Sequence, residues 1–258
     1  AYLVRDGWLV EVNGTRTSRI VEVARIPLTI GGLARHNVAN ALAASGGARG
    51  LGATLEGVRD GLIDFAPSAD RSPGRLNLFR LGARVVIVDF AHNEAGISAV
   101  LDVAEGIAGG AAGRAAPVTA IVGTAGDRPD DTLRGIGRIA AERSQRVVIK
   151  ETRKYLRGRT EGSVIGELLA GVKAGGGVAA GDVPIYESET AALRAELNGA
   201  GGNGHGRGAD APRVIVLMCH EEREAVFDLL SSLGARPVDI ATELTTLVPR
   251  LQERPRRA

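Results

Sequence analysis

Apolar and polar residues alternate along the chain with two different periods, and these periods predict where strands give way to helices. Residues 2–12 alternate around Asp6-Gly7, a dipeptide that favours a two-residue hairpin turn, and β character continues over residues 19–28. Residues 36–50 and 54–65 instead space their apolar side chains as helices do. Residues 66–75 concentrate Pro, Ser, Asp and Gly, so we place a domain boundary near residue 70.

Strands and helices alternate beyond this boundary. We expect a hairpin over residues 76–90 and single strands at residues 118–123, 146–150, 184–187 and 213–219. Helical segments at residues 97–107, 132–144, 163–172, 189–198 and 222–234 separate or follow them. This alternation predicts an α/β fold with a Rossmann-like, doubly wound, mostly parallel sheet. Residues 198–212 have little apolar content and are expected to form a surface loop.

Composition narrows the classes of partner. The 32 Lys and Arg residues nearly balance 30 Asp and Glu, so the formal charge of +2 predicts no nucleic-acid partner. Cys219 is the only cysteine and the four histidines are scattered without ligand spacing, so these residues predict no metal site and no internal disulfide. No apolar run approaches the ~20 residues of a membrane span, so we expect no membrane association and a cytoplasmic location.

Candidate chemistry lies where the predicted parallel strands end, because ligands bind beyond the carboxyl ends of such strands. Four strand ends are polar: "DFAHN" from residue 89, "GTAGDRPD" from residue 123, Lys150-Glu151, and "CHEE" from residue 219. The first favours either a ribose-binding carboxylate or a helix cap. The second favours either an anion-orienting charge pair or an exposed turn. The basic run over residues 150–159 is either an anion-binding patch or a solvated face.

Four short motifs together resemble one family. "HNVANALAA" at 36–44, "SPGR" at 72–75, "VDFAHN" at 88–93 and "GDR" at 126–128 occur in the order and spacing of the carboxyl-terminal half of the Mur ligase family. Within that family, residues 126–172 most resemble the cyanophycin synthetase branch. The resemblance implies an ATP-dependent amide ligase that activates a carboxylate as an acyl phosphate, which an amino acid such as arginine then attacks.

The resemblance also implies roles for the nucleotide side of the site. Asn37 and Asn40 match family asparagines near the adenine, and Arg75 matches an arginine that reaches the nucleotide phosphates. Asp89 matches the ribose-binding acid, and Asn93 belongs to the same motif. These five residues are therefore the candidates for cofactor binding, with ATP as the cofactor.

Other matched residues belong to catalysis and to the substrates. His92 completes the "DFAHN" motif, so Arg75, His92 and Arg128 are the candidate catalytic residues. The resemblance implies an amino acid and a carboxylate, which in the cyanophycin branch is a polymer, as substrates. The candidates for binding them are Asp127, Arg128, Lys150, Glu151, Arg157 and Arg159. Cationic donors and positioning carry most phosphoryl-transfer catalysis, which explains why these residue types are useful.

Departures from the family pattern indicate that this chain is part of a longer protein. The chain has no Gly-Lys-Ser/Thr phosphate loop and opens with Ala1, so we expect a longer protein whose missing upstream part supplies that loop and the Mg²⁺ ligands. Residues 1–70 would finish a central ATPase domain, residues 71–258 would form the carboxyl-terminal domain, and the isolated chain is expected to be inactive. Glu94 stands where the family commonly has proline.

Two alternatives stay open on the sequence alone. One is a peptidoglycan-precursor or folylpolyglutamate ligase of the same fold, and the other is a catalytically silent nucleotide-binding or scaffold domain. The acceptor amino acid and any homo-oligomer are not determined by these residues.

Overall fold

The structure divides into two units. A computed structural model describes residues 1–109, 116–177, 182–199 and 211–248, so most of the predicted loop over residues 198–212 lies outside the described residues. One unit contains Ala1–Pro67 together with the segment from Asp239, and the other contains Ser68–Val238. The segment from Asp239 was assigned from sequence to the second domain, whereas its contacts group it with the first unit. The equivalence of these units to the family's domains stays a prediction.

The first unit begins with a three-stranded antiparallel sheet. Strands β1 (Tyr2–Arg5), β2 (Trp8–Asn13) and β3 (Arg16–Glu22) pair in sequence order. Asp6 and Gly7 join the first two strands with φ angles of 51° and 79°, the left-handed conformation that a two-residue hairpin turn requires. The predicted hairpin over residues 2–12 is therefore confirmed.

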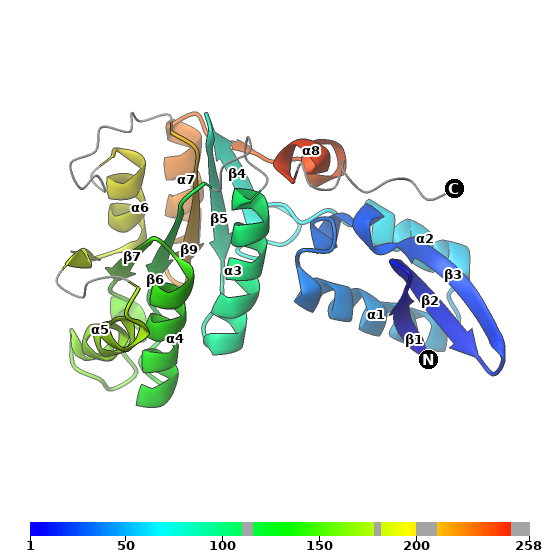
Figure 1. The fold of residues 1–258 in the computed structure, drawn as a ribbon, viewed down its shortest axis with the longest axis horizontal. Coiled ribbons are helices and arrows are strands. Elements are labelled where there is room, and N and C mark those ends of the chain that lie inside the picture. The colour runs from blue at the N-terminus through cyan, green and yellow to red at the C-terminus, as the bar shows by residue number, and fades with distance from the viewer. Residues whose placement is uncertain (110–115, 178–181, 200–210, 249–258) are drawn as a thin grey trace. The chain divides into compact units, whose positions relative to one another are not determined.

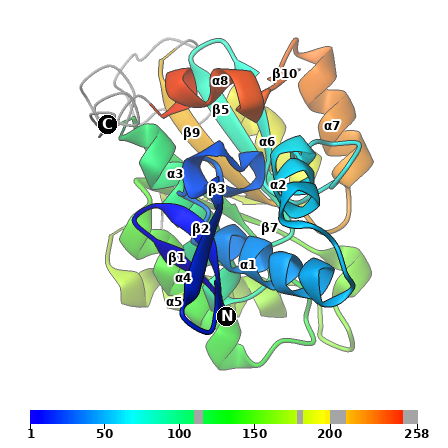
Figure 2. The same cartoon turned by 90° about the vertical axis from the view of Figure 1, so that its right-hand side faces the viewer.

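Two helices follow this sheet in the chain, α1 (Arg35–Gly50) and α2 (Leu55–Asp64), and both were predicted. Both helices contact strands of this sheet (Figure 2). Leu9, Ile20, Ile26 and Val58 form one buried apolar cluster there. The β character expected up to residue 28 is wrong beyond Glu22, because the chain turns through two 3₁₀ segments, η1 (Val23–Arg25) and η2 (Pro27–Thr29).

Thr29 stabilises that turn. Its hydroxyl, fully buried, lies 2.7 Å from the carbonyl oxygen of Val23 and 2.8 Å from that of Ile26, so it donates across both 3₁₀ segments. Helix α8 (Ile240–Leu247), which belongs to this unit by its contacts, was not predicted.

The second unit contains a seven-stranded sheet in the order β10-β4-β5-β9-β6-β7-β8 (Figure 1). Strands β5 (Arg84–Asp89), β9 (Arg213–Met218), β6 (Val118–Val122), β7 (Arg146–Lys150) and β8 (Ile185–Tyr186) run parallel. At one edge, strand β4 (Asn77–Leu81) pairs antiparallel with β5, and β10 (Arg236–Pro237) pairs antiparallel with β4. The predicted Rossmann-like, mostly parallel sheet is confirmed.

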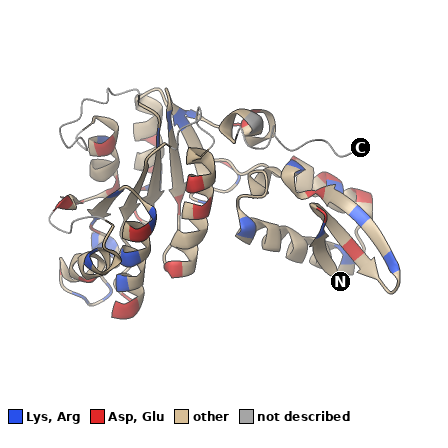
Figure 3. Ribbon diagram, viewed as in Figure 1, with Lys and Arg blue, Asp and Glu red and all other residues tan. Residues whose placement is uncertain are grey.

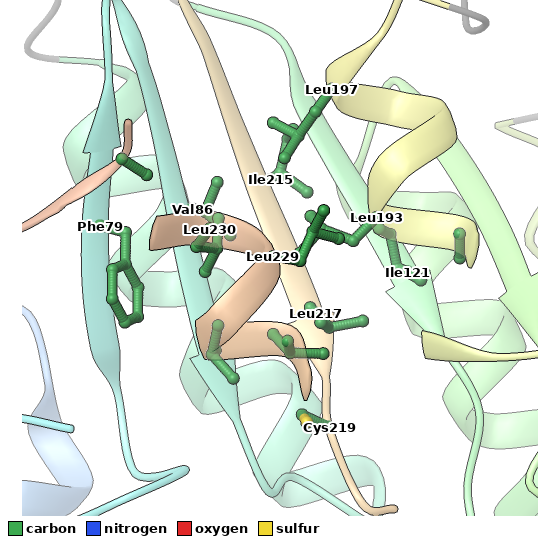
Figure 4. Close-up of a cluster of buried hydrophobic side chains, with 14 of the residues drawn as sticks. Phe79, Val86, Ile121, Leu193, Leu197, Ile215, Leu217, Cys219, Leu229 and Leu230 are labelled. Carbon is green, nitrogen blue, oxygen red and sulfur yellow. The ribbon is translucent and has the colours of Figure 1, made fainter. Parts of the chain in front are cut away.

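Helices cover both faces of this sheet. Helices α6 (Glu189–Leu197) and α7 (Arg223–Ser232) pack on one face, where Leu193 and Leu230 meet Ile215 and Leu217 of β9 (Figure 4). Helices α3 (Glu94–Ala108), α4 (Asp130–Arg143) and α5 (Ser163–Gly175) contact strands β6, β7 and β9. A single 3₁₀ turn, η3 (Arg153–Tyr155), follows β7.

Helix α3 carries only acidic charges, whereas α4 and α5 carry charges of both signs (Figure 3). Arg143 of α4 lies 2.7 Å from carboxylate oxygens of both Asp102 and Glu105 of α3, and Arg134 of α4 lies 2.6 Å from Glu167 of α5. These surfaces therefore pair their charges locally instead of forming a single-sign patch. Among the residues described, every helix is too short or too polar to cross a bilayer.

Candidate functional site at the carboxyl ends of the strands

The end of strand β5 brings two predicted residues together. Asp89 is 8 % exposed, and its carboxylate Oδ2 accepts a hydrogen bond from the backbone N–H of Leu76 at 2.8 Å. The backbone N–H of Phe90 donates to the carbonyl oxygen of Gly74, also at 2.8 Å. These two bonds hold the "SPGR" segment against the strand end, and the Arg75 guanidinium lies 4.9 Å from the centre of the Phe90 ring.

His92 and Asn93 occupy the start of helix α3. The Asn93 side-chain oxygen accepts a hydrogen bond from the backbone N–H of Gly96 at 2.8 Å, so Asn93 caps the helix. The His92 Nδ1 atom lies 3.1 Å from the carbonyl oxygen of Phe90, to which it donates because a carbonyl only accepts. The helix-cap interpretation thus holds for Asn93, while Asp89 binds the segment that precedes β4.

The "GDR" loop after β6 is held by Arg159. The Arg159 guanidinium donates to the carbonyl oxygen of Gly126 at 2.6 Å, to that of Arg128 at 2.9 Å, and to the carboxylate of Asp130 at 2.6 Å. A side chain at Gly126 would collide with the carbonyl group of Leu156, so this close approach requires glycine.

The other residues predicted to bind substrate differ in accessibility. Asp127 and Arg128 form a partly exposed pair, with Nε of Arg128 lying 3.7 Å from the Asp127 carboxylate. Glu151 is buried and accepts hydrogen bonds from the backbone N–H groups of Thr152 at 3.2 Å and Gly162 at 3.1 Å, which closes the intervening loop. Arg157 is exposed, and its guanidinium lies 5.1 Å from the Tyr155 ring centre. The predicted basic run is therefore not one continuous patch.

Lys150 points into the protein, where its ammonium group is fully bonded. The residue is 1 % exposed, and its Nζ lies 2.6 Å from Oε1 of Glu189, 3.2 Å from Oγ1 of Thr152 and 3.1 Å from Nδ1 of His220. An ammonium group has three N–H bonds, so these three acceptors use all of them. We call Lys150, Thr152, Glu189, Cys219 and His220 the Lys150 network.

Gly123 makes room for this arrangement. It follows strand β6, which lies between β7 and β9, and Lys150 must pass the end of β6 to reach His220. A Cβ atom at Gly123 would lie 2.6 Å from Cε of Lys150 and 2.5 Å from its carbonyl oxygen, closer than real side chains approach. The glycine therefore allows the lysine side chain to cross the strand end.

Glu189 is the anion of the Lys150 network. Its carboxylate accepts hydrogen bonds from the backbone N–H groups of His220 at 2.6 Å and Glu222 at 2.8 Å, and from the Cys219 thiol at 3.1 Å. Burial by itself raises the pKa of Glu189, but Lys150 and these N–H groups outweigh it and lower the pKa to about 2. The charged carboxylate thus fixes the loop between β9 and α7.

His220 is neutral in this environment. Burial and the adjacent Lys150 ammonium lower its pKa to about 3. Burial also raises the pKa of the Cys219 thiol, which therefore lacks the thiolate character of a nucleophile. The sequence analysis placed His220 in the polar strand end "CHEE" without giving it a role, and it did not single out Glu189 or Thr152. The available signal was Lys150 at the end of a buried strand, since such a charge needs a buried partner.

Asn37 and Asn40 belong to the first unit. The side-chain amide of Asn37 donates to the carbonyl oxygen of Leu28 at 3.0 Å, and that of Asn40 donates to the Asn37 side-chain oxygen at 3.1 Å. Asn40 also lines a mostly apolar cavity of about 380 Å³ between α1 and α2, with Leu28, Val58 and Phe65. The adenine-binding role of the two asparagines stays a prediction.

Metal ligands are not grouped in the described part of the chain. Across residues 1–109, 116–177, 182–199 and 211–248, no three His, Cys, Asp or Glu side chains gather closely enough to hold a metal ion. These residues do not fit a magnesium site by themselves, and the expectation that its ligands lie elsewhere stays a prediction.

Comparison with known proteins identifies the class of protein and then its family. No family model matches the chain. A murein peptide ligase from Psychrobacter arcticus has a similar fold, with a TM-score of 0.52 and 19 % identity over 90 % of this chain and 43 % of that one. This similarity, together with the mostly parallel seven-stranded sheet, defines the class of the second unit as a Rossmann-like α/β domain.

Sequence relatives give the family. Cyanophycin synthetases from Synechocystis sp. and Crocosphaera subtropica are 37 % identical to 77 % and 67 % of this chain, which spans 22 % and 19 % of their lengths. A UDP-N-acetylmuramoyl-L-alanyl-D-glutamate–2,6-diaminopimelate ligase from Gloeobacter violaceus is 30 % identical over 63 % of this chain and 31 % of its own length. The chain belongs to the Mur ligase family, and it spans about a fifth of the length of the cyanophycin synthetases it matches.

Proposed function

We propose that this chain is the carboxyl-terminal part of an ATP-dependent amide ligase of the cyanophycin synthetase type. A carboxylate oxygen would attack the γ-phosphorus of ATP and release ADP, and the amine of an amino acid such as arginine would then displace phosphate from the acyl carbon and lose a proton. The identity to cyanophycin synthetases supports this proposal. The observation that carries it is the pairing of Asp89 with the Arg75 segment at the end of β5.

The geometry suits a nucleotide. Arg75 offers a planar fork that can bind two phosphate oxygens, and the Phe90 ring under its guanidinium limits where that fork can point. The Asp89 carboxylate, fixed by the Leu76 N–H, is an acceptor for a ribose hydroxyl. Charge on the phosphoryl oxygens is stabilised mainly by positioned cations, so these side chains can contribute without a protein nucleophile. The exposed Asp127 and Arg128 pair is available to the amino acid.

A second candidate is a peptidoglycan-precursor ligase, which the diaminopimelate ligase from Gloeobacter violaceus supports. The two candidates differ in the amino acid that acts as the acceptor. Phosphate release by the complete polypeptide that carries this chain, measured with arginine, lysine, diaminopimelate and glutamate in turn, distinguishes them. If none of these acceptors supports ATP turnover, the result favours the catalytically silent scaffold domain.

The test of the proposal uses Arg75→Ala and Asp89→Ala in that complete polypeptide. Each variant should lower the rate of ligation at least about tenfold, a loss of about 1.4 kcal/mol in transition-state binding. The 258-residue chain alone should not hydrolyse ATP, because it carries no Gly-Lys-Ser/Thr loop. Wild-type ligation by both variants would remove these residues from the site, and robust ATPase activity of the chain would contradict the assignment to a partial domain.

A further inference from the structure

The Lys150 network determines which nitrogen of His220 carries the proton. The Lys150 ammonium can only donate, so Nδ1 of His220, 3.1 Å away, must be the acceptor and carry no proton. The proton of the neutral ring then sits on Nε2. That atom lies 2.8 Å from the carbonyl oxygen of Ala91 and donates to it. The ring is thus fixed from two sides.

The backbone around His220 is fixed as well. The His220 N–H donates to Glu189 at 2.6 Å, and the Cys219 N–H donates to the carbonyl oxygen of Asp89 at 2.8 Å. The Glu222 N–H donates to Glu189 at the start of α6. The Glu222 carboxylate accepts hydrogen bonds from both the backbone N–H and the hydroxyl of Thr190, each at 2.9 Å. The starts of helices α6 and α7 are therefore joined reciprocally, and the loop that carries His220 has little freedom to move.

His220 in turn contacts the loop that carries the candidate nucleotide residues. Ala91 lies between Phe90 and His92, so the bond to its carbonyl oxygen holds the middle of the "DFAHN" loop. The His220 ring also meets the Phe90 ring edge-on, with centres 5.0 Å apart and an interplanar angle of 61°. The Phe90 ring also contacts the Arg75 guanidinium, which lies 4.9 Å from the ring centre.

We propose that His220, held in its Nε2–H form by Lys150 and Glu189, is a positioning residue that fixes the Ala91 carbonyl and the Phe90 ring and thereby orients Asp89 and Arg75. This role rests on the proposed function and adds to it the residue that shapes the nucleotide loop. A protonated ring would turn an N–H toward the Lys150 ammonium. The low pKa of His220, caused by burial and by that ammonium, keeps the ring in the acceptor form at neutral pH.

Two substitutions of His220 separate its two hydrogen bonds. In His220→Gln, the side-chain N–H₂ occupies the place of Nε2 and can still donate to Ala91, whereas the acceptor for Lys150 is lost. In His220→Asn, the side-chain oxygen occupies the place of Nδ1 and can still accept from Lys150, but the shorter side chain does not reach Ala91. The matched control is Glu196→Gln, which breaks a second buried ion pair between α6 and β7, at the opposite end of that strand.

Steady-state ligation by the complete polypeptide supplies the functional readout. His220→Asn should raise KM for ATP or lower kcat/KM about fivefold to tenfold, the size expected for one lost hydrogen bond, while His220→Gln recovers most of the loss. Glu196→Gln should lower the melting temperature without changing KM. Wild-type kinetics in His220→Asn would overturn the proposal, and so would equal losses in the Asn and Gln variants.

Nitrogen-15 and carbon-13 NMR of the 258-residue chain provides a readout that does not depend on ligation. The His220 ring should show the Nε2–H form between pH 5 and 8, and the Ala91 carbonyl resonance should shift in His220→Asn but not in His220→Gln. A ring protonated at Nδ1 would overturn the proposal. If the wild-type polypeptide does not ligate any acceptor, the proposed function fails while these NMR results still decide whether His220 holds the loop.

Discussion

Removing the negative charge of Glu189 should destabilise the second unit strongly. Glu189→Gln leaves the Lys150 ammonium buried without an anion, and it turns an amide N–H₂ group toward backbone N–H groups that need an acceptor. Breaking a buried pair in this way costs about 3–5 kcal/mol. The pKa of Glu189 gives an independent value: lowering it from 4.5 to about 2 corresponds to roughly 3 kcal/mol at about 1.36 kcal/mol for each pKa unit.

Removing the other partner of this ion pair, by Lys150→Met, should lower the free energy of unfolding by less than Glu189→Gln does. The Glu189 carboxylate keeps the backbone N–H groups of His220 and Glu222 as donors, whereas the ammonium in Glu189→Gln has no other anion within hydrogen-bonding distance in the described residues. Glu196→Gln is the matched control. Its partner Arg146 is 21 % exposed, so water can solvate the guanidinium after the change, and the loss should be only about 1.5–3 kcal/mol.

Amide hydrogen exchange in strands β6, β7 and β9 is the appropriate assay, because it measures the free energy of opening of the second unit by itself. The pKa of Glu189 is lowered in the folded state, so its contribution is fully present above pH 4.5 and is lost as the pH falls toward 2. Wild-type and Glu189→Gln protein should therefore converge in stability over that window. A smaller loss in Glu189→Gln than in Glu196→Gln, or a pH-independent difference, would refute the reasoning.

Two further predictions concern residues around the Lys150 network. Gly123→Ala should lower the melting temperature by several degrees, because its Cβ would collide with Lys150. A Cβ at Gly166 on helix α5 meets no atom within 4 Å, so Gly166→Ala should stabilise the protein by about 0.5–1 kcal/mol. A similar response of the two variants in calorimetry would contradict the close approach at Gly123. His220 has a lowered pKa, so its contribution to stability is present above pH 6.5 and is lost as the pH falls toward 3. Urea midpoints between pH 7 and 4 should therefore fall less steeply in His220→Gln than in wild type, and parallel slopes would exclude this titration.

Local pattern was sufficient for most elements of the fold. β-branched runs such as residues 84–89 and 146–149 form strands because they are buried on both faces, and the apolar spacing of residues 97–107 places one side of α3 on the sheet. The pattern failed after Glu22, where a buried Thr29 hydroxyl stabilises 3₁₀ turns that apolar periodicity does not reveal. Helix α8 was missed because a single short helix has little periodic signal.

The candidate site, like the fold, was only partly predictable from the sequence. Sequence alone indicated that the strand ends near Asp89, Asp127 and Lys150 carry polar side chains, and the shared edge of a parallel sheet predicted that they lie near one another. It could not indicate that Lys150 points inward, because a lysine at a strand end is usually solvated. Its partner Glu189 follows a Ser helix cap, and in sequence it has the pattern of an ordinary acid in the first turn of a helix.

The sequence by itself determined most of the secondary structure, the α/β class and the family of this protein, because strand burial, helix periodicity and four short motifs are local properties of the chain. Only the tertiary structure decided that β9, the last of the parallel strands along the chain, lies between β5 and β6. That insertion places His220 beside Ala91 and within reach of Lys150 across the end of β6. Strand order depends on how crossover connections pack over the whole sheet, and no local pattern encodes it.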